Sequence, residues 1–324
     1  MKKWLPTLAL ALAMTGCAKN GAPVSSSLPE SSPPPTATAS SSASPSASAS
    51  SSASAPESPS ASPEAPSPSQ AVLDIGRLGP LFGFANKEGT KLISLPVSPE
   101  EGKASPGPAE TYRQAVGEGG QVLTIRFEKH QSRTEQDNGR DAAHNFANLE
   151  GDVYEVEGGT ATPNASYYLL EEGSLLPEAL IPVRQEEARE LTPDQSSAIA
   201  EAKGRAIDQG WLLATLEDGR GVFAVQFERQ GEDVLASLAV DDGERWLFLD
   251  YPAKYDENST WRVDDGGEIS PFAFSFLFAA RSEGGLALGV KWMGAEGENL
   301  SIVEQKGDRF EETSIVSGRY QSPI

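Results

Sequence analysis

The chain has 324 residues, with 26 Lys and Arg against 47 Asp and Glu, and a formal net charge of −21. Such an acidic chain repels nucleic acid and anionic lipid headgroups, so we expect no nucleic-acid partner. Cys17 is the single cysteine, which excludes an intramolecular disulfide and leaves stability to the hydrophobic core. No motif implies a cofactor.

The first residues have the parts of an export signal in the usual order. Lys2 and Lys3 form a charged start, residues 4–14 form an apolar stretch, and Gly16 is a small residue directly before Cys17. The apolar stretch is too short to span a bilayer. The order of these parts therefore predicts export and cleavage.

Met14-Thr15-Gly16-Cys17 resembles the lipobox of bacterial lipoproteins, with Met14 where that family usually has Leu. The resemblance is confined to the first twenty or so residues. It implies a signal peptide over residues 1–16 and acylation of Cys17, which becomes the first mature residue and anchors the chain in the bilayer. The location implied is the cell membrane, with the domain on the extracytoplasmic side. An ordinary secretory signal with a chance cysteine is the alternative.

Residues 17–70 begin at Cys17 and continue as a stretch rich in Ser, Ala and Pro. A stretch with so few apolar side chains cannot offset its conformational entropy by burial, so we expect a disordered linker. The folded domain should then cover residues 71–324. It carries all of the formal charge, because the first 70 residues hold equal numbers of acidic and basic side chains.

Two helices are expected in this domain. One runs from Arg140 to Leu149, and Ala142 and Phe146 lie on its inner face. The other has Thr192 and Gln195 as a capping box and Gly210 as its end, with a narrow apolar stripe that should pack on a sheet. A division into two lobes meeting near residues 185–191 is an option.

The second half of the domain alternates apolar and polar residues, which is typical of strands with one buried face. Examples are residues 223–227, 234–240 and 286–292. Asp-Gly pairs at residues 218–219, 242–243 and 265–266 predict tight turns between antiparallel strands. The fold class expected is therefore α+β, a mainly antiparallel meander with a few packed helices.

Alternate residues from Phe272 to Phe278 are phenylalanine, and the segment fits either a strand or a helix. Ser270-Pro271 before it and Gly284-Gly285 after it slightly favour a helix. Burial is expected in both cases. Exposed rings would instead form a platform for stacking sugars.

The usual motifs of nucleophilic and zinc-dependent hydrolases are absent from the sequence. His130 and His144 are the only histidines, and both are expected at the surface. Acidic residues are abundant, so carboxylate pairs give only a weak signal for glycoside cleavage. The candidates for a ligand site or an acid are two neighbouring pairs, Glu296 with Glu298 and Asp264 with Asp265.

The sequence favours a membrane-anchored, extracytoplasmic lipoprotein with a non-catalytic domain that binds or senses something at the cell envelope. Its expected partners are the bilayer, through Cys17, and a cell-wall component or envelope protein. One alternative is a hydrolase of wall glycan that uses a carboxylate pair. A second alternative is the solute-binding component of an importer, which should have parallel sheets alternating with helices.

Overall fold

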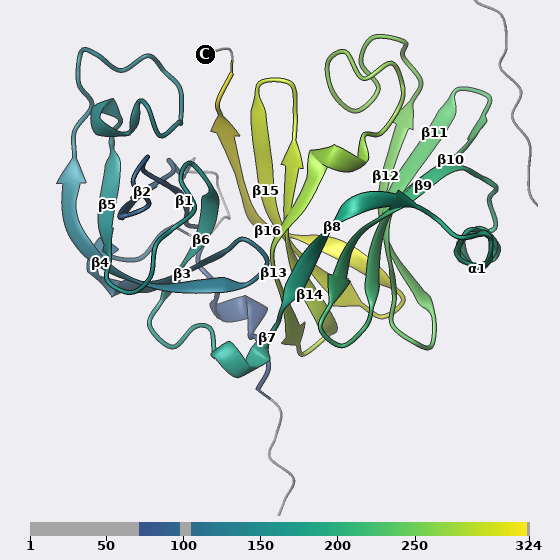
Figure 1. Cartoon of the computed structure of the whole chain (residues 1–324), viewed down its shortest axis with the longest axis horizontal. Coiled ribbons are helices and arrows are strands. Elements are labelled where there is room, and N and C mark those ends of the chain that lie inside the picture. The colour runs from purple at the N-terminus through teal and green to yellow at the C-terminus, as the bar shows by residue number, and fades with distance from the viewer. Residues whose placement is uncertain (1–70, 98–104, 323–324) are drawn as a thin grey trace, which may run out of the picture. The chain divides into compact units, whose positions relative to one another are not determined.

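The computed structural model describes residues 71–97 and 105–322, all within the compact unit Ala65–Ile324. The predicted signal peptide, Cys17 and the linker up to residue 70 lie outside the described residues. Strands dominate the described part, which has a single α-helix (Figure 1). The expected α+β fold is therefore wrong, because the described protein is nearly all β.

The first sheet is a closed barrel with the strand order β1-β2-β5-β4-β3-β6, in which β6 pairs with β1. Its strands are β1 (Phe82–Ala85), β2 (Lys91–Ser94), β3 (Tyr112–Gly117), β4 (Gln121–Gln131), β5 (Gly151–Val156) and β6 (Ser166–Glu171). Buried side chains that include Tyr112, Tyr154 and Tyr167 fill it. The inside of this barrel is thus a packed core.

The second sheet has ten strands in the order β7-β13-β14-β15-β16-β12-β11-β10-β9-β8. They are β7 (Leu180–Ile181), β8 (Val183–Glu190), β9 (Ile207–Leu216), β10 (Gly221–Gln230), β11 (Asp233–Asp241), β12 (Trp246–Lys254), β13 (Phe274–Ser282), β14 (Gly285–Met293), β15 (Gly297–Lys306) and β16 (Arg309–Tyr320). The sheet is curled, so that its two ends come close together. Gln185 Nε2 of the edge strand β8 donates to the carbonyl oxygen of Phe274 at 3.4 Å, and Phe274 lies in β13, next to the other edge strand β7. The connection from the barrel to this sheet lies between β6 and β7. The sequence suggested a boundary between two lobes near residues 185–191, and residues 185–190 of that range lie within β8.

The helix α1 (Pro193–Lys203) begins as the sequence predicts. The Thr192 side chain accepts from the Gln195 backbone N–H, and the Gln195 side chain accepts from the Thr192 N–H, which confirms the capping box. The helix ends earlier than expected, at Gly204 with φ of +67°, because Ile207 already belongs to β9. No helix in the described ranges has the length and apolar character needed to cross a membrane.

The central strands of the second sheet are buried on both faces, where the sequence led us to expect one. On β10, Phe223 and Val225 pack in a cluster with Ile199 of α1. Val222 and Ala224 point the other way into the core that the curled sheet encloses. The helix covers the outer face of the sheet at this point. Successive residues of β10 therefore alternate between two buried apolar clusters, one under the helix and one inside the curled sheet.

The helix expected from Arg140 to Leu149 is wrong. This segment is irregular apart from a single 3₁₀ turn, Phe146–Asn148. The Asn145 amide donates to Asp137 Oδ1 at 2.7 Å and to the Arg140 carbonyl at 2.9 Å. Such side-chain bonds to nearby groups compete with helical pairing.

For the phenylalanine series the strand alternative is correct. Phe274 begins β13, after a 3₁₀ turn that leaves Phe272 81% exposed. A bulge between Phe276 and Phe278 in the pairing with β14 shifts the alternation. Phe274 and Phe276 therefore face the core of the curled sheet, and Phe278 instead stacks on Tyr168 of the barrel, with ring centroids 6.2 Å apart.

All three predicted Asp-Gly turns have glycine at positive φ, with +91° at Gly219, +90° at Gly243 and +61° at Gly266. The first two join neighbouring antiparallel strands, as the meander requires. The third lies instead in the long loop between β12 and β13. The Gln226 side chain holds this loop by donating to the Gly267 carbonyl and accepting from the Ile269 N–H.

Candidate functional site

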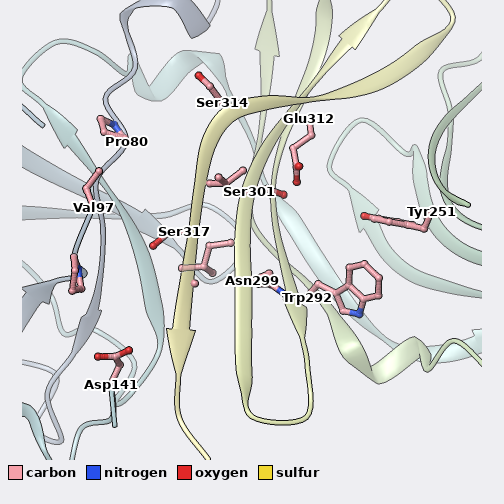
Figure 2. Close-up of a pocket in the computed structure, with 14 residues that line it drawn as sticks. Pro80, Val97, Asp141, Tyr251, Trp292, Asn299, Ser301, Glu312, Ser314 and Ser317 are labelled. Atoms are coloured by element: carbon pink, nitrogen blue, oxygen red, sulfur yellow. The ribbon is translucent and has the colours of Figure 1, made fainter. Parts of the chain in front are cut away.

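The strands β12 and β16 are neighbours that pair only at Phe248 and Arg309. Beyond Arg309, no strand of the described chain pairs with the second edge of β16, which keeps β15 on its first edge. Pro252 lies on the free stretch of β12 and has no backbone N–H to offer. The two strands diverge, and a cavity of about 790 Å³ opens along the free edge of β16 (Figure 2).

The cavity wraps around β16, and its two sides differ in character (Figure 2). We call one side the aromatic groove; its residues are Tyr251, Trp292, Asn299, Ser301 and Glu312. The other side includes Pro80, Val97, Asp141 and Ser317 (Figure 2). Because the groove lies where the curled sheet is open, its side chains reach both solvent and the edge of the core.

Two rings form the wall of the aromatic groove, and a third supports them from the core. The Tyr251 and Trp292 centroids are 4.7 Å apart with an interplanar angle of 62°. Trp292 also stacks on buried Phe274 at 5.2 Å. Trp261 Nε1 donates to the Tyr251 carbonyl oxygen at 2.9 Å, which fixes this part of β12. The aromatic wall is therefore held in place before any ligand arrives.

Three polar side chains of the groove have no partner among the residues that the structure describes. The Glu312 carboxylate, the Asn299 amide and the Ser301 hydroxyl make no hydrogen bond or ion pair with any described residue. Burial raises the pKa of the Tyr251 phenol, and the negative charge of Glu312, which lines the same cavity, raises it further. The groove thus combines apolar ring surface with polar side chains whose hydrogen-bonding capacity is not used by the described part of the chain.

The two carboxylates that line the cavity, Asp141 and Glu312, lie on opposite sides of β16 (Figure 2). Asp141 Oδ2 accepts the Tyr320 N–H at 3.0 Å, and the Asp141 N–H donates to the Tyr320 carbonyl at 2.7 Å. Burial raises the pKa of Asp141. These bonds tie Asp141 to the end of β16, and the strand separates it from Glu312.

Glu298, one of the predicted candidates, is almost fully buried and already has partners. Its Oε1 lies 3.2 Å from Arg319 Nη1 and accepts the Ser166 hydroxyl, while Oε2 lies 3.9 Å from Lys291 Nζ. Burial lowers the pKa of Arg319, and the Glu298 charge opposes that change. The carboxylate therefore belongs to an internal ion pair.

Glu296 lies in the exposed turn between β14 and β15. Its carbonyl oxygen accepts the N–H groups of Gln321 and Ser322, both at 2.8 Å. It lines an open hollow of about 420 Å³ that Glu298 also borders. The structure thus brings this predicted pair together, but the Glu298 charge is already neutralised by Arg319.

The other predicted pair, Asp264 and Asp265, shapes the loop between β12 and β13. Asp264 is exposed with φ of +60°. The Asp265 carboxylate accepts four backbone N–H groups, those of Thr260, Trp261, Arg262 and Gly267, at 2.6–3.0 Å. Burial raises the pKa of Asp265, but these hydrogen bonds outweigh it and lower the pKa overall. Both residues therefore act in turn formation.

Both histidines are exposed, as the sequence predicts. His130 Nδ1 lies 2.8 Å from Asp152 Oδ1, and His144 Nε2 lies 3.1 Å from the Asn138 amide nitrogen. Over the described ranges, no group of three or more His, Cys, Asp or Glu side chains is placed to hold a metal ion.

Sequence reasoning missed the residues of the aromatic groove. Glu312 follows Phe310 by two positions in β16 and so lies on the same face of the strand, although Phe310 is buried and Glu312 is exposed. Pro252 within a strand was a second signal, because proline marks an edge. Neither signal indicates which strands are neighbours in the sheet. The groove could therefore be recognised only from the strand order and pairing in the structure.

Comparisons with protein-family models, with curated proteins and with solved structures found no match to this chain.

Proposed function

We propose that the chain is a membrane-anchored, extracytoplasmic lipoprotein whose β domain binds a small ligand in the aromatic groove without transforming it. The anchor rests on the lipobox-like residues that end at Cys17. The binding role rests on the groove itself. These two parts stand on separate observations and are tested separately.

The observation that carries the binding role is the combination of Tyr251 and Trp292 with the unpartnered Glu312 in one cavity. Because the aromatic wall is already fixed, its side chains lose little conformational entropy when a ligand binds, so less of the binding free energy is used to offset that loss. Polar groups without protein partners can bond a ligand with no internal bond to break. A concave site with a few convergent polar groups is the usual form of a small-molecule site.

Hydrolysis of wall glycan is the alternative with less support. A glycosidase needs two carboxylates that flank one bond, about 5–9.5 Å apart. In this cavity β16 stands between Asp141 and Glu312 (Figure 2). The importer alternative also has less support, because the ten-stranded sheet is almost entirely antiparallel and does not alternate strands with helices.

The anchor is tested by expressing the full chain and Cys17→Ser in bacteria that are fed a labelled fatty acid. We expect label and membrane fractionation for the unmodified chain, and loss of both for Cys17→Ser. A Ser44→Cys change in the C17S background is the matched control and should not restore the label. Unchanged membrane fractionation of Cys17→Ser would contradict the anchor.

The binding role is tested by titrating the purified full chain with N-acetylglucosamine, lysine and choline, one probe at a time, while tryptophan fluorescence is followed. We expect a saturable change in fluorescence with at least one probe. The change should disappear in Trp292→Phe, because the tryptophan that reports on the groove is then removed. Trp246→Phe removes a tryptophan outside the groove and should keep the response. Incubation with purified cell wall, with released fragments measured, would reveal a hydrolase instead.

A further inference from the structure

We infer that the ligand of the aromatic groove is an organic cation with an alkylated ammonium group; this rests on the binding role proposed above. The described residues that line the cavity include two carboxylates, Asp141 and Glu312, and no Lys, Arg or His. Among the described lining residues nothing is positively charged, so a positive charge inside the cavity would come from the ligand. The formal charge of −21 acts in the same direction by attracting cations to the protein.

Glu312 is the anionic group best placed for this role. Its nearest acidic neighbour in sequence, Glu311, is paired with Arg309, with Nη2 and Oε1 2.5 Å apart. Glu312 makes no such pair among the described residues. Glu312 lines the same cavity as Tyr251 and Trp292 and lies on the same side of β16 as these rings (Figure 2). A cation in the groove would therefore meet a carboxylate that is not already neutralised.

The rings supply the second half of the recognition. An ammonium group is attracted to the face of Trp or Tyr within about 6 Å of the ring centroid. Tyr251 and Trp292 meet at 62°, so a compact group in the corner between them contacts both rings. Methyl groups on the nitrogen would also bury apolar surface against the rings. An aromatic corner next to a carboxylate therefore suits an alkylated ammonium better than a bare metal ion.

Other ligand classes use these groups less well. An anion in the aromatic groove would be repelled by Glu312, and no basic side chain among the described lining residues would offset that repulsion. A neutral sugar could stack on Trp292, but it would partly dehydrate the Glu312 carboxylate without compensating its charge. The cation satisfies both the rings and the carboxylate.

The test compares choline with 3,3-dimethylbutan-1-ol, which has the same shape but carbon in place of the charged nitrogen. Calorimetric titration of the purified full chain should give saturable binding for choline, weaker by about tenfold or more for the neutral isostere. Equal binding of the two compounds would overturn the inference, since charge would then contribute nothing.

Variants locate the site. Glu312→Gln should weaken choline binding by about three- to fivefold, as expected for a partly exposed ion pair. Glu311→Gln removes the same charge one residue away and should leave binding unchanged. Trp292→Leu should weaken binding by about tenfold, and Trp292→Phe, which keeps a ring, by less. Equal effects of Glu312→Gln and Glu311→Gln would contradict the assignment.

The outcomes separate this inference from the proposal on which it rests. Binding of N-acetylglucosamine that depends on Trp292, with no binding of choline, would keep the binding role and overturn the cationic ligand. Binding of none of the probes, with Trp292 fluorescence unchanged throughout, would count against both. Choline binding that survives Trp292→Leu would place the cation at another site and overturn the inference.

Discussion

Arg319 and Glu298 form a buried ion pair at the junction of the two sheets, with Nη1 and Oε1 3.2 Å apart. Arg319 also donates to the Asp141 and Asn164 carbonyls, both at 2.6 Å, and lies 4.0 Å above the centre of the Phe84 ring. It therefore links β16 to the barrel and its loops. These bonds hold in place the strand whose free edge forms the cavity.

Arg319→Met should lower the free energy of unfolding by about 3–5 kcal/mol, because it leaves Glu298 buried without its counter-charge. Arg309→Met removes an exposed pair with Glu311 and should change stability by at most about 1 kcal/mol. Urea unfolding of the full chain measures both. In the double variant Arg319→Met with Glu298→Met, part of the loss should return; equal stability of Arg319→Met and Arg309→Met would contradict the role of the pair.

Asp265→Asn should destabilise the loop between β12 and β13 by about 1–2 kcal/mol at neutral pH, because a charged acceptor of four N–H bonds is lost. The folded pKa of Asp265 lies below its ordinary 3.8, so the contribution is complete above that pH and is lost as pH falls through the folded pKa. Unfolding curves of wild type and Asp265→Asn should thus converge at low pH. Asp264→Asn is the control and should behave like wild type; a gap that stays constant with pH would disprove the mechanism.

Phe274→Ala should cost about 3–5 kcal/mol of stability, because it removes a buried ring that supports Trp292. Phe272→Ala, two residues earlier, should change stability by less than about 0.5 kcal/mol, because its ring is 81% exposed. Thermal or urea unfolding compares them directly. Similar losses for the two variants would argue against the strand register described.

Thr192→Ala should destabilise the protein by about 1 kcal/mol, since it removes one half of the capping box of α1. Ser197→Ala, at an exposed position inside the same helix, is the matched control and should be neutral or slightly stabilising. Amide exchange in residues 193–203 provides a local measure. Unchanged exchange in Thr192→Ala would show that packing of Ile199 alone keeps the helix formed.

Local patterns predicted local features well. The capping box at Thr192 and the positive φ of Gly219 and Gly243 follow from interactions within a few residues, so their side chains are sufficient to specify them. The segment from Arg140 to Leu149 shows the limit. Its apolar spacing fits a helix, but asparagine bonds to loop groups override the pattern, and no periodicity reveals those partners.

By itself the sequence determined the acidic character of the chain, the lipoprotein-like signal ending at Cys17, which stays a prediction, and the alternation of its strands. Each of these depends on neighbours along the chain. Only the tertiary structure decided that Glu298 is an internal ion-pair partner while Glu312 faces an open groove, because strand pairing brings distant residues together. The divergence of β12 from β16 depends on how all the strands of the sheet pair. Because the two strands diverge, Tyr251, Trp292 and Glu312 line one cavity.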